Sequence, residues 1–245
     1  MPLFTKSLKI KSFTNKQVGR YMLYALGEIV LVVAGILIAL QINNYNEERK
    51  KKKLVDGVLQ SITYDLELDT LTVGAAIKYY EARDSVAKAI IDDKYSREDF
   101  EKCTLCPTLI STYVPLKIND KGYSRLKEIV DSSKKKDTLT VEIVQFYNAF
   151  DALLTQFGDE VKEFTLENVR DWRDNQPWFS KVTSGRMDER LYDYMESQDY
   201  KNKVAYYYVI VCRNYNTMLK AYKTNAAEVL KNIKERKNLD SIQKS

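Results

Sequence analysis

The most apolar stretch of the chain runs from Tyr21 to Ile42 and precedes a long remainder of mixed polarity. Its length matches the roughly 20 residues that an α-helix needs to cross the ~30 Å hydrocarbon core of a bilayer. Glu28 is the only charged residue inside it. A buried helix in a soluble core is the alternative. However, the favourable transfer of the Ile, Leu and Val side chains into lipid outweighs one carboxylate, which costs roughly 2.5 to 3.5 kcal/mol. The pattern therefore predicts a transmembrane helix over 21–42.

Beyond this stretch, apolar residues continue at helical spacing, and the next proline is Pro107. We expect the helix to run on to about Ile91. Ser96 and Asp99 have the spacing of a capping box and predict a short helix that begins there. The sequence "TYVPLKIND", residues 112–120, predicts an extended linker.

The second half of the chain shows further helical stripes. Asn119 or Asp120 is expected to cap the first of these helices. The others are expected from about Thr138 to a stop at Pro177, around Arg186–Met195, and from near Asp199 onward with a stripe that begins Val204, Tyr208, Val211. Burying these stripes against one another predicts an all-α chain, in which the transmembrane helix continues into an antiparallel helical bundle over 43–245.

The predicted span has basic flanks. Tyr21, Tyr24 and Tyr45 border it as an aromatic belt would. Basic residues near the span are balanced on its two sides, but a short basic N-terminus before a long domain usually stays inside. No Ala-x-Ala cleavage site follows Leu40, so an uncleaved signal-anchor is expected rather than a signal peptide. We therefore place residues 1–20 in the cytoplasm as a short basic amphipathic segment and residues 43–245 outside it. The basic residues of this segment are Lys6, Lys9, Lys11, Lys16 and Arg20, and the apolar residues that alternate with its lysines are Phe4, Leu8, Ile10 and Phe13.

One face of the predicted span carries Glu28, Gly35 and Ala39, because these residues are four and seven positions apart. Gly35 and Ala39 form a small-xxx-small pair, which lets two helices approach closely. Glu28 has three interpretations. It pairs with its copy or with a polar group of another membrane protein, it reaches the headgroups and sets the depth of the helix, or it lies on a proton or ion pathway.

Composition and charge exclude several classes of function. The formal net charge is +5, and residues 1–20 account for the surplus. The rest of the chain lacks the broad basic face that a nucleic-acid-binding protein needs. The sequence contains no histidine, which excludes His-based acid–base catalysis, Ser-His-Asp and Cys-His triads, and His-ligated metals. We therefore expect no catalytic residue, no cofactor, no metal and no nucleic-acid partner.

The sequence "CTLCP" contains Cys103 and Cys106, with two residues between them. A structural disulfide, a redox-active pair and a metal site are the alternatives. A thioredoxin-type pair requires a βαβ context, and structural zinc normally requires four ligands. A local disulfide is the simplest expectation outside the cytoplasm. Cys212 lies in an apolar helix and is expected in the core.

The stretch "YMLYALGEIVLVVAGILIALQINNYNEE" resembles the N-terminal signature of a large family of uncharacterised bacterial membrane proteins. These share a Gly-Glu-Ile opening, a "GILIALQINN" core and a Trp or Tyr followed by Asn-Glu. A weaker similarity covers "KGYSRLKEIVDSSKKKDTLTVEIVQFY", although its turn lacks the glycine of the family pattern. The resemblance implies a single-span anchor in the bacterial inner membrane and a periplasmic helical domain. It implies no activity.

The sequence thus favours a non-enzymatic, membrane-anchored helical module for interaction, scaffolding or sensing. Its expected partners are the lipid bilayer and either a second copy or another membrane protein, contacted through Glu28, Gly35 and Ala39. The alternatives are an envelope thiol-redox protein that uses Cys103 and Cys106, and an accessory subunit of an ion-coupled membrane complex that uses Glu28.

Overall fold

The computed structural model describes residues 15–133 and 137–242, and the predicted amphipathic stretch from Phe4 to Phe13 lies outside them. Two compact units meet at a boundary between Leu54 and Val55. Each unit is described by itself below. The prediction of an all-α chain is confirmed, because the described residues contain helices and no strand.

Unit one consists, over its described residues, of the first part of helix α1, Asn15–Ile91. Its apolar stretch is exposed along its whole length, with Leu31 75% and Tyr21 71% exposed. The most apolar 18-residue window has a mean hydropathy of 2.5. By length and composition, this helix is able to cross a membrane.

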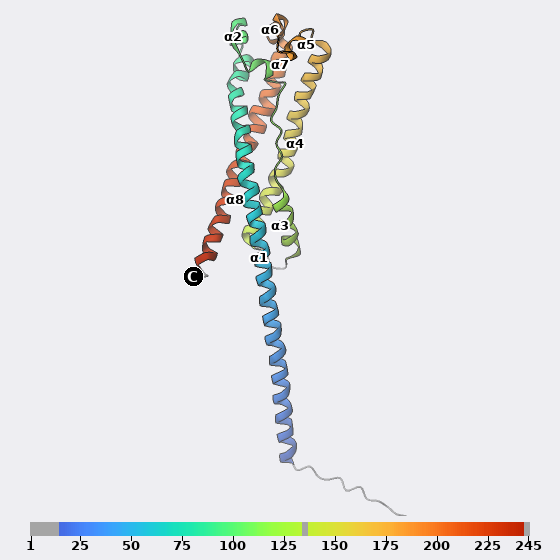
Figure 1. Cartoon of the computed structure of the whole chain (residues 1–245), viewed down its shortest axis with the longest axis vertical. Coiled ribbons are helices and arrows are strands. Elements are labelled where there is room, and N and C mark those ends of the chain that lie inside the picture. The colour runs from blue at the N-terminus through green and yellow to red at the C-terminus, as the bar shows by residue number, and fades with distance from the viewer. Residues whose placement is uncertain (1–14, 134–136, 243–245) are drawn as a thin grey trace, which may run out of the picture. The chain divides into compact units, whose positions relative to one another are not determined.

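Unit two is a helical bundle. The second part of α1 is followed by the predicted helices and by three elements that were not predicted, η1, α5 and η2 (Figure 1). They are α2 Arg97–Lys102, the 3₁₀ turn η1 Cys106–Thr108, α3 Lys121–Ser132, α4 Thr138–Asn175, α5 Phe179–Thr183, α6 Glu189–Met195, α7 Gln198–Tyr207, the π-helix η2 Tyr208–Tyr215 and α8 Asn216–Ile242.

Helix α8 is antiparallel to both other long helices of unit two. Ion pairs join Glu67 to Lys234 and Glu81 to Lys220, so residue numbers rise along α1 as they fall along α8. The ring contact between Phe146 of α4 and Tyr222 of α8, together with the ion pair between Asp137 at the start of α4 and Arg236 of α8, gives α4 the same relation to α8. Helices α1 and α4 consequently run in the same direction, because the extended segment 112–120 leads the chain back along the bundle before α3 begins (Figure 1).

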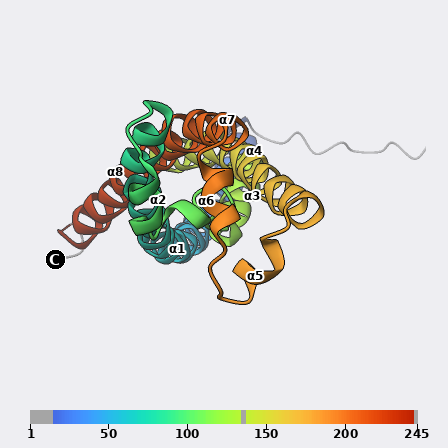
Figure 2. The same ribbon diagram turned by 90° about the horizontal axis from the view of Figure 1, so that it is seen from above.

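The core of unit two is rich in tyrosine. From above, α1, α4 and α7 surround the bundle centre (Figure 2). Aromatic rings pack there edge to face, as in the pair Tyr80 and Tyr215, whose ring centroids are 5.7 Å apart. The largest fully buried aromatic side chains are Trp178, Tyr80, Tyr147, Tyr200, Tyr207, Tyr215 and Tyr222. Such rings fill wide gaps between helices with few rotatable bonds.

The last predicted helix differs from the structure in two ways. It begins at Gln198 with Ser197 as its cap, one residue before the expected Asp199, and it contains the π-helix η2. A π turn holds more residues than an α turn and so changes which side chains face the core. Tyr207, the last residue of α7, is buried, while Tyr208, which the sequence pattern placed in the core stripe, is half-buried. Helix α5, after Pro177, was not predicted.

The helix caps follow the sequence prediction at one end of the bundle only. The Ser96–Asp99 capping box is confirmed, with both reciprocal bonds present. For α3, the predicted Asp120 is the N-cap residue, but its side chain does not make the expected cap bond. Asn119 binds elsewhere. Instead, Asp65 of α1 accepts a hydrogen bond from the Gly122 N–H at 3.1 Å, so a neighbouring helix supplies the carboxylate that the helix N-terminus favours.

Candidate functional site

The predicted association face lies on the first part of α1. Glu28, Gly35 and Ala39 are all exposed, and within the described residues Glu28 has no hydrogen bond or ion pair. A side chain built at Gly35 would meet nothing within 4 Å. The face is therefore uncovered by the rest of unit one, and its small residues leave the helix backbone open to a close neighbour.

Cys103 and Cys106 form a disulfide, with a sulfur–sulfur distance of 2.06 Å. Cys106 is fully buried and Cys103 is half-buried. The Cys106 N–H donates to Cys103 Sγ, and the Tyr200 hydroxyl donates to the Cys106 carbonyl oxygen at 2.8 Å. Cys103 follows the C-terminal end of α2, where the helix dipole disfavours a thiolate. This setting suits a cross-link that fixes the α2–η1 turn against α7.

The third cysteine is a core residue, as expected. Cys212 lies in η2 and is buried. Burial raises the pKa of its thiol to about 12, with a smaller contribution from the negative charge of Asp84. Because the thiolate is the nucleophilic form, this thiol is unreactive at neutral pH.

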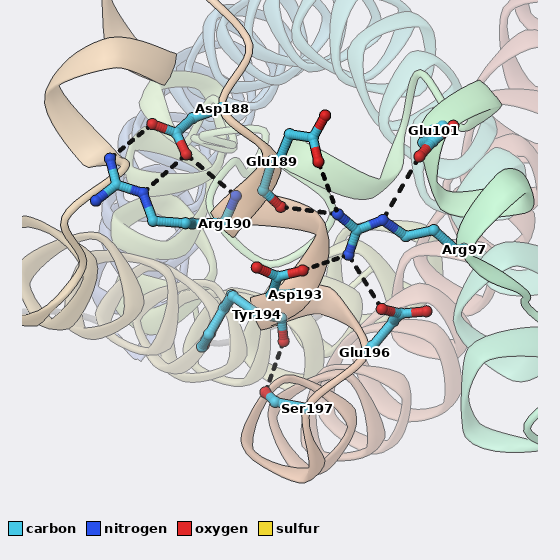
Figure 3. Close-up of polar contacts among 9 residues, drawn as sticks. All are labelled: Arg97, Glu101, Asp188, Glu189, Arg190, Asp193, Tyr194, Glu196 and Ser197. Carbon is cyan, nitrogen blue, oxygen red and sulfur yellow. Dashed lines mark hydrogen bonds and ion pairs between the residues drawn. The ribbon is translucent and has the colours of Figure 1, made fainter.

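Arg97 centres an ion-pair cluster at one end of unit two (Figure 3). Its guanidinium lies 2.6 Å from the Asp193 carboxylate and 3.1 Å from that of Glu196, and it donates to the Glu189 carbonyl oxygen at 3.1 Å. Glu101, one turn along α2, lies 3.5 Å from the same group. Arg97 thereby joins α2 to α6.

Asp188 makes a second cluster beside the first (Figure 3). Its side chain accepts from the backbone N–H of Arg190 at 3.1 Å and so caps α6. The Arg190 guanidinium and the Lys181 ammonium also bind it, at 2.7 and 3.0 Å. Hydrogen bonds from Arg190, and then from Lys181, lower the pKa of Asp188 well below its usual value. The carboxylate is therefore held in its ionised form to fix the loop after α5.

Lys203 of α7 lies among acids and a phenol, a combination found in some acid–base sites. It binds Asp171 and Asp199, and it lies 3.2 Å from the Tyr194 hydroxyl, which also accepts from the Trp172 indole. Burial opposes the charge on Lys203, but the hydrogen bonds to Asp171 and Asp199 outweigh it and raise its pKa. A lysine that stays protonated is no general base at neutral pH, so the cluster is a structural ion pair.

Asp69 is a buried acid that sequence reasoning missed. It is 1% exposed and accepts hydrogen bonds from the Asn119 backbone N–H at 3.1 Å, the Asn119 side-chain amide at 2.6 Å and the Tyr222 hydroxyl at 3.0 Å. Burial raises its pKa, although these donors oppose the shift. Asp69 thus ties the linker and α8 to α1. The sequence contained one sign that Asp69 is buried: it lies at helical spacing between Leu66 and Val73, on the face of α1 that packs into the core.

A groove of about 420 Å³ lies between the extended segment 113–118 and α4. Leu116 and Leu154 are among its apolar lining residues, and Gly158 leaves its wall without a side chain. Tyr215 also lines it, and burial raises the pKa of this phenol to about 12. The Tyr215 hydroxyl is therefore neutral at physiological pH.

These arrangements bind the helices of unit two together. No group of three or more metal-ligating side chains occurs in the described part of the chain. Arg97, Asp188 and Lys203 are each engaged in ion pairs with neighbouring side chains. What remains uncovered is apolar helix surface, above all on α1.

Comparison with known proteins gives one match. A family model described as "Family of unknown function (DUF6090)" matches residues 28–213. No curated protein and no solved structure matches the chain. The matched region begins inside the apolar stretch, at Glu28, and ends inside the π-helix.

Proposed function

The chain belongs to this family of unknown function, and we propose that it is a membrane-anchored, non-enzymatic helical module for interaction, scaffolding or sensing in the bacterial envelope. It associates with a second copy or with another membrane protein through Glu28, Gly35 and Ala39. Residues 1–20 lie in the cytoplasm and the bundle in the periplasm.

The observation that carries the proposal is the exposed apolar helix. A soluble protein rarely leaves a contiguous apolar surface of this size facing water. Every residue from Tyr21 to Ile42 is exposed within unit one, so lipid is the solvent that this surface suits. An unpaired carboxylate in lipid is costly, which favours a polar contact for Glu28 with a neighbouring helix.

The disulfide supports the sidedness. Disulfides form and persist in oxidising compartments such as the periplasm and are rare in the cytosol. A bridge between Cys103 and Cys106 therefore favours a bundle outside the cytoplasm. Burial of Cys106 favours a structural role for this bridge over the thiol-redox alternative.

The anchor and the contact are tested together by native mass spectrometry of the full chain in mild detergent, after carbonate washing of the membranes. We expect the protein to stay in the membrane pellet and to form a complex. Glu28→Leu and Ala39→Ile are expected to reduce the complex, because the first removes the polar contact and the second blocks close approach.

Ala34→Ile is the matched control, since it makes the same change well away from the Glu28 face. Equal losses for Ala34→Ile and Ala39→Ile would contradict a specific face. A protein that washes into the supernatant, or a wild type without any associated chain, would refute the proposal.

A further inference from the structure

A second uncovered row of residues lies on α1, within unit two. Its large members are Tyr64, Leu68 and Leu71, which are 69%, 41% and 72% exposed. Small residues continue the row at both ends, and no charged residue interrupts it. We call the row the α1 seam, and it consists of Gly57, Ser61, Tyr64, Leu68, Leu71 and Ala75.

The spacing of the α1 seam alternates between four and three residues, which is the heptad pattern of a coiled-coil contact. The bundle does not use these positions. Its own contacts with α1 go through a different face that includes Ile62, Leu66 and Val73, all of them buried. Helix α1 therefore carries two apolar rows in unit two, and the bundle fills one of them.

The two flanks of the α1 seam are occupied by the bundle. On one side, the bond from Gly122 to Asp65 brings α3 close, and Lys121 and Arg125 line a surface hollow together with Tyr64. On the other side, Glu67 is ion-paired with Lys234 of α8. The α1 seam lies on the same helix as the apolar stretch that is able to cross a membrane, so the anchors of two copies orient their α1 helices in parallel, the arrangement in which a heptad row packs against its own copy.

We propose that a second copy of this chain docks on the α1 seam, with the two α1 helices parallel. The proposal rests on the proposed function, because an anchor on the same helix holds both copies on one side of one membrane. Tyr64, Leu68 and Leu71 of each copy pack against the same residues of the other. Ser61 and Ala75 let the two helices approach at the ends of the contact.

The size of the α1 seam fits a contact between anchored chains. Three large side chains bury far less than the roughly 800 Å² per partner of a standard interface. The seam is therefore a weak contact in free solution. Confinement of both copies to one membrane raises their effective concentration and makes such a contact sufficient.

Cysteine cross-linking of the full chain in lipid nanodiscs tests the contact. Leu68→Cys is expected to give a disulfide-linked dimer on mild oxidation, since facing positions of a parallel helix pair come within disulfide range. Leu153→Cys on α4 is the matched control, with an exposure of 39% against 41% for Leu68. It is expected to give at least about tenfold less dimer.

A second measurement uses charge in place of a cross-link. Leu71→Glu is expected to lower the dimer fraction in native mass spectrometry, with an association constant at least about tenfold weaker, because it buries a charge in an apolar contact. Leu153→Glu is expected to leave the dimer fraction and the association constant unchanged. Circular dichroism verifies that both variants keep their helix content.

The outcomes separate this inference from the proposed function. If Leu68→Cys gives no dimer while association still depends on Ala39, the α1 seam is not the contact and the proposed function stands. If Leu68→Cys cross-links to a different protein, the seam receives another partner and the inference is wrong. If the wild type is monomeric, the inference and the proposed association both fall.

Discussion

Gly122 is the position where a single methyl group should disturb unit two most. It lies in the first turn of α3, pressed against α1. A Cβ atom there would be 2.7 Å from Ile62 Cγ1 and 3.0 Å from the Ile62 backbone nitrogen. The backbone atom cannot rotate away, so Gly122→Ala must push α3 from α1 and stretch the hydrogen bond from Gly122 to Asp65.

The expected cost follows from these contacts. Overpacking a close contact costs about 1–3 kcal/mol, and weakening a hydrogen bond to a charged group adds about 1 kcal/mol. The higher helix propensity of alanine offsets up to about 1 kcal/mol. We therefore expect Gly122→Ala to lower the free energy of unfolding by about 1–3 kcal/mol.

Gly158→Ala is the matched control, because it makes the same change in the interior of α4. The nearest atom to its new Cβ is the Tyr215 hydroxyl oxygen at 3.6 Å, which is an ordinary contact. Helix propensity then dominates, and we expect a gain of about 0.5–1 kcal/mol.

Urea unfolding of the full chain in mild detergent measures both variants. Circular dichroism reports the helices, and fluorescence reports the buried Trp172 and Trp178. A Gly122→Ala variant as stable as the wild type would refute the close α1–α3 contact. A loss in Gly158→Ala equal to that in Gly122→Ala would show that both glycines are needed for another reason.

Two further predictions concern the end of unit two that carries the disulfide. Replacing Cys103 and Cys106 together by serine is expected to cost about 2 kcal/mol in urea unfolding, the loop-entropy value for so short a loop; an unchanged midpoint would show that the bridge adds no stability. Arg190 and Lys181 lower the pKa of Asp188 in the folded state. The ionised carboxylate therefore contributes fully to the free energy of unfolding at a pH above its unfolded pKa, which is about 3.9, and this contribution is lost as the pH falls through the lower pKa of the folded state. Asp188→Asn should therefore flatten the acid limb of thermal unfolding measured against pH, and an acid limb identical to that of the wild type would contradict this reading.

The helices of this chain are predictable because their information is local. The apolar spacing marks the long helices, and the Ser96–Asp99 pair marks α2 within four residues of sequence. The apolar stretch before Ile42 likewise needs no partner for its recognition, since its length and composition are sufficient.

The polar contacts of the bundle are not predictable in this way, because their partners are distant in sequence. The bond between Asp65 and Gly122 spans 57 positions, and that between Arg97 and Asp193 spans 96. A local rule assigns the cap of α3 to Asp120, whereas the fold brings Asp65 to the same place. Similarly, nothing local distinguishes the π turn at Tyr208 from the α-helix around it.

The bond between Asp69 and Tyr222 spans 153 positions, and it has a consequence for biosynthesis. A ribosome produces α1 first and α8 last, so four of the tyrosines that fill the bundle centre, Tyr200, Tyr207, Tyr215 and Tyr222, arrive only with the final part of the chain. Until then, the buried face of α1 is bare and prone to aggregation. A nascent chain that stalls before Tyr222 should therefore depend on a holding chaperone, whereas release of the full chain lets the bundle close.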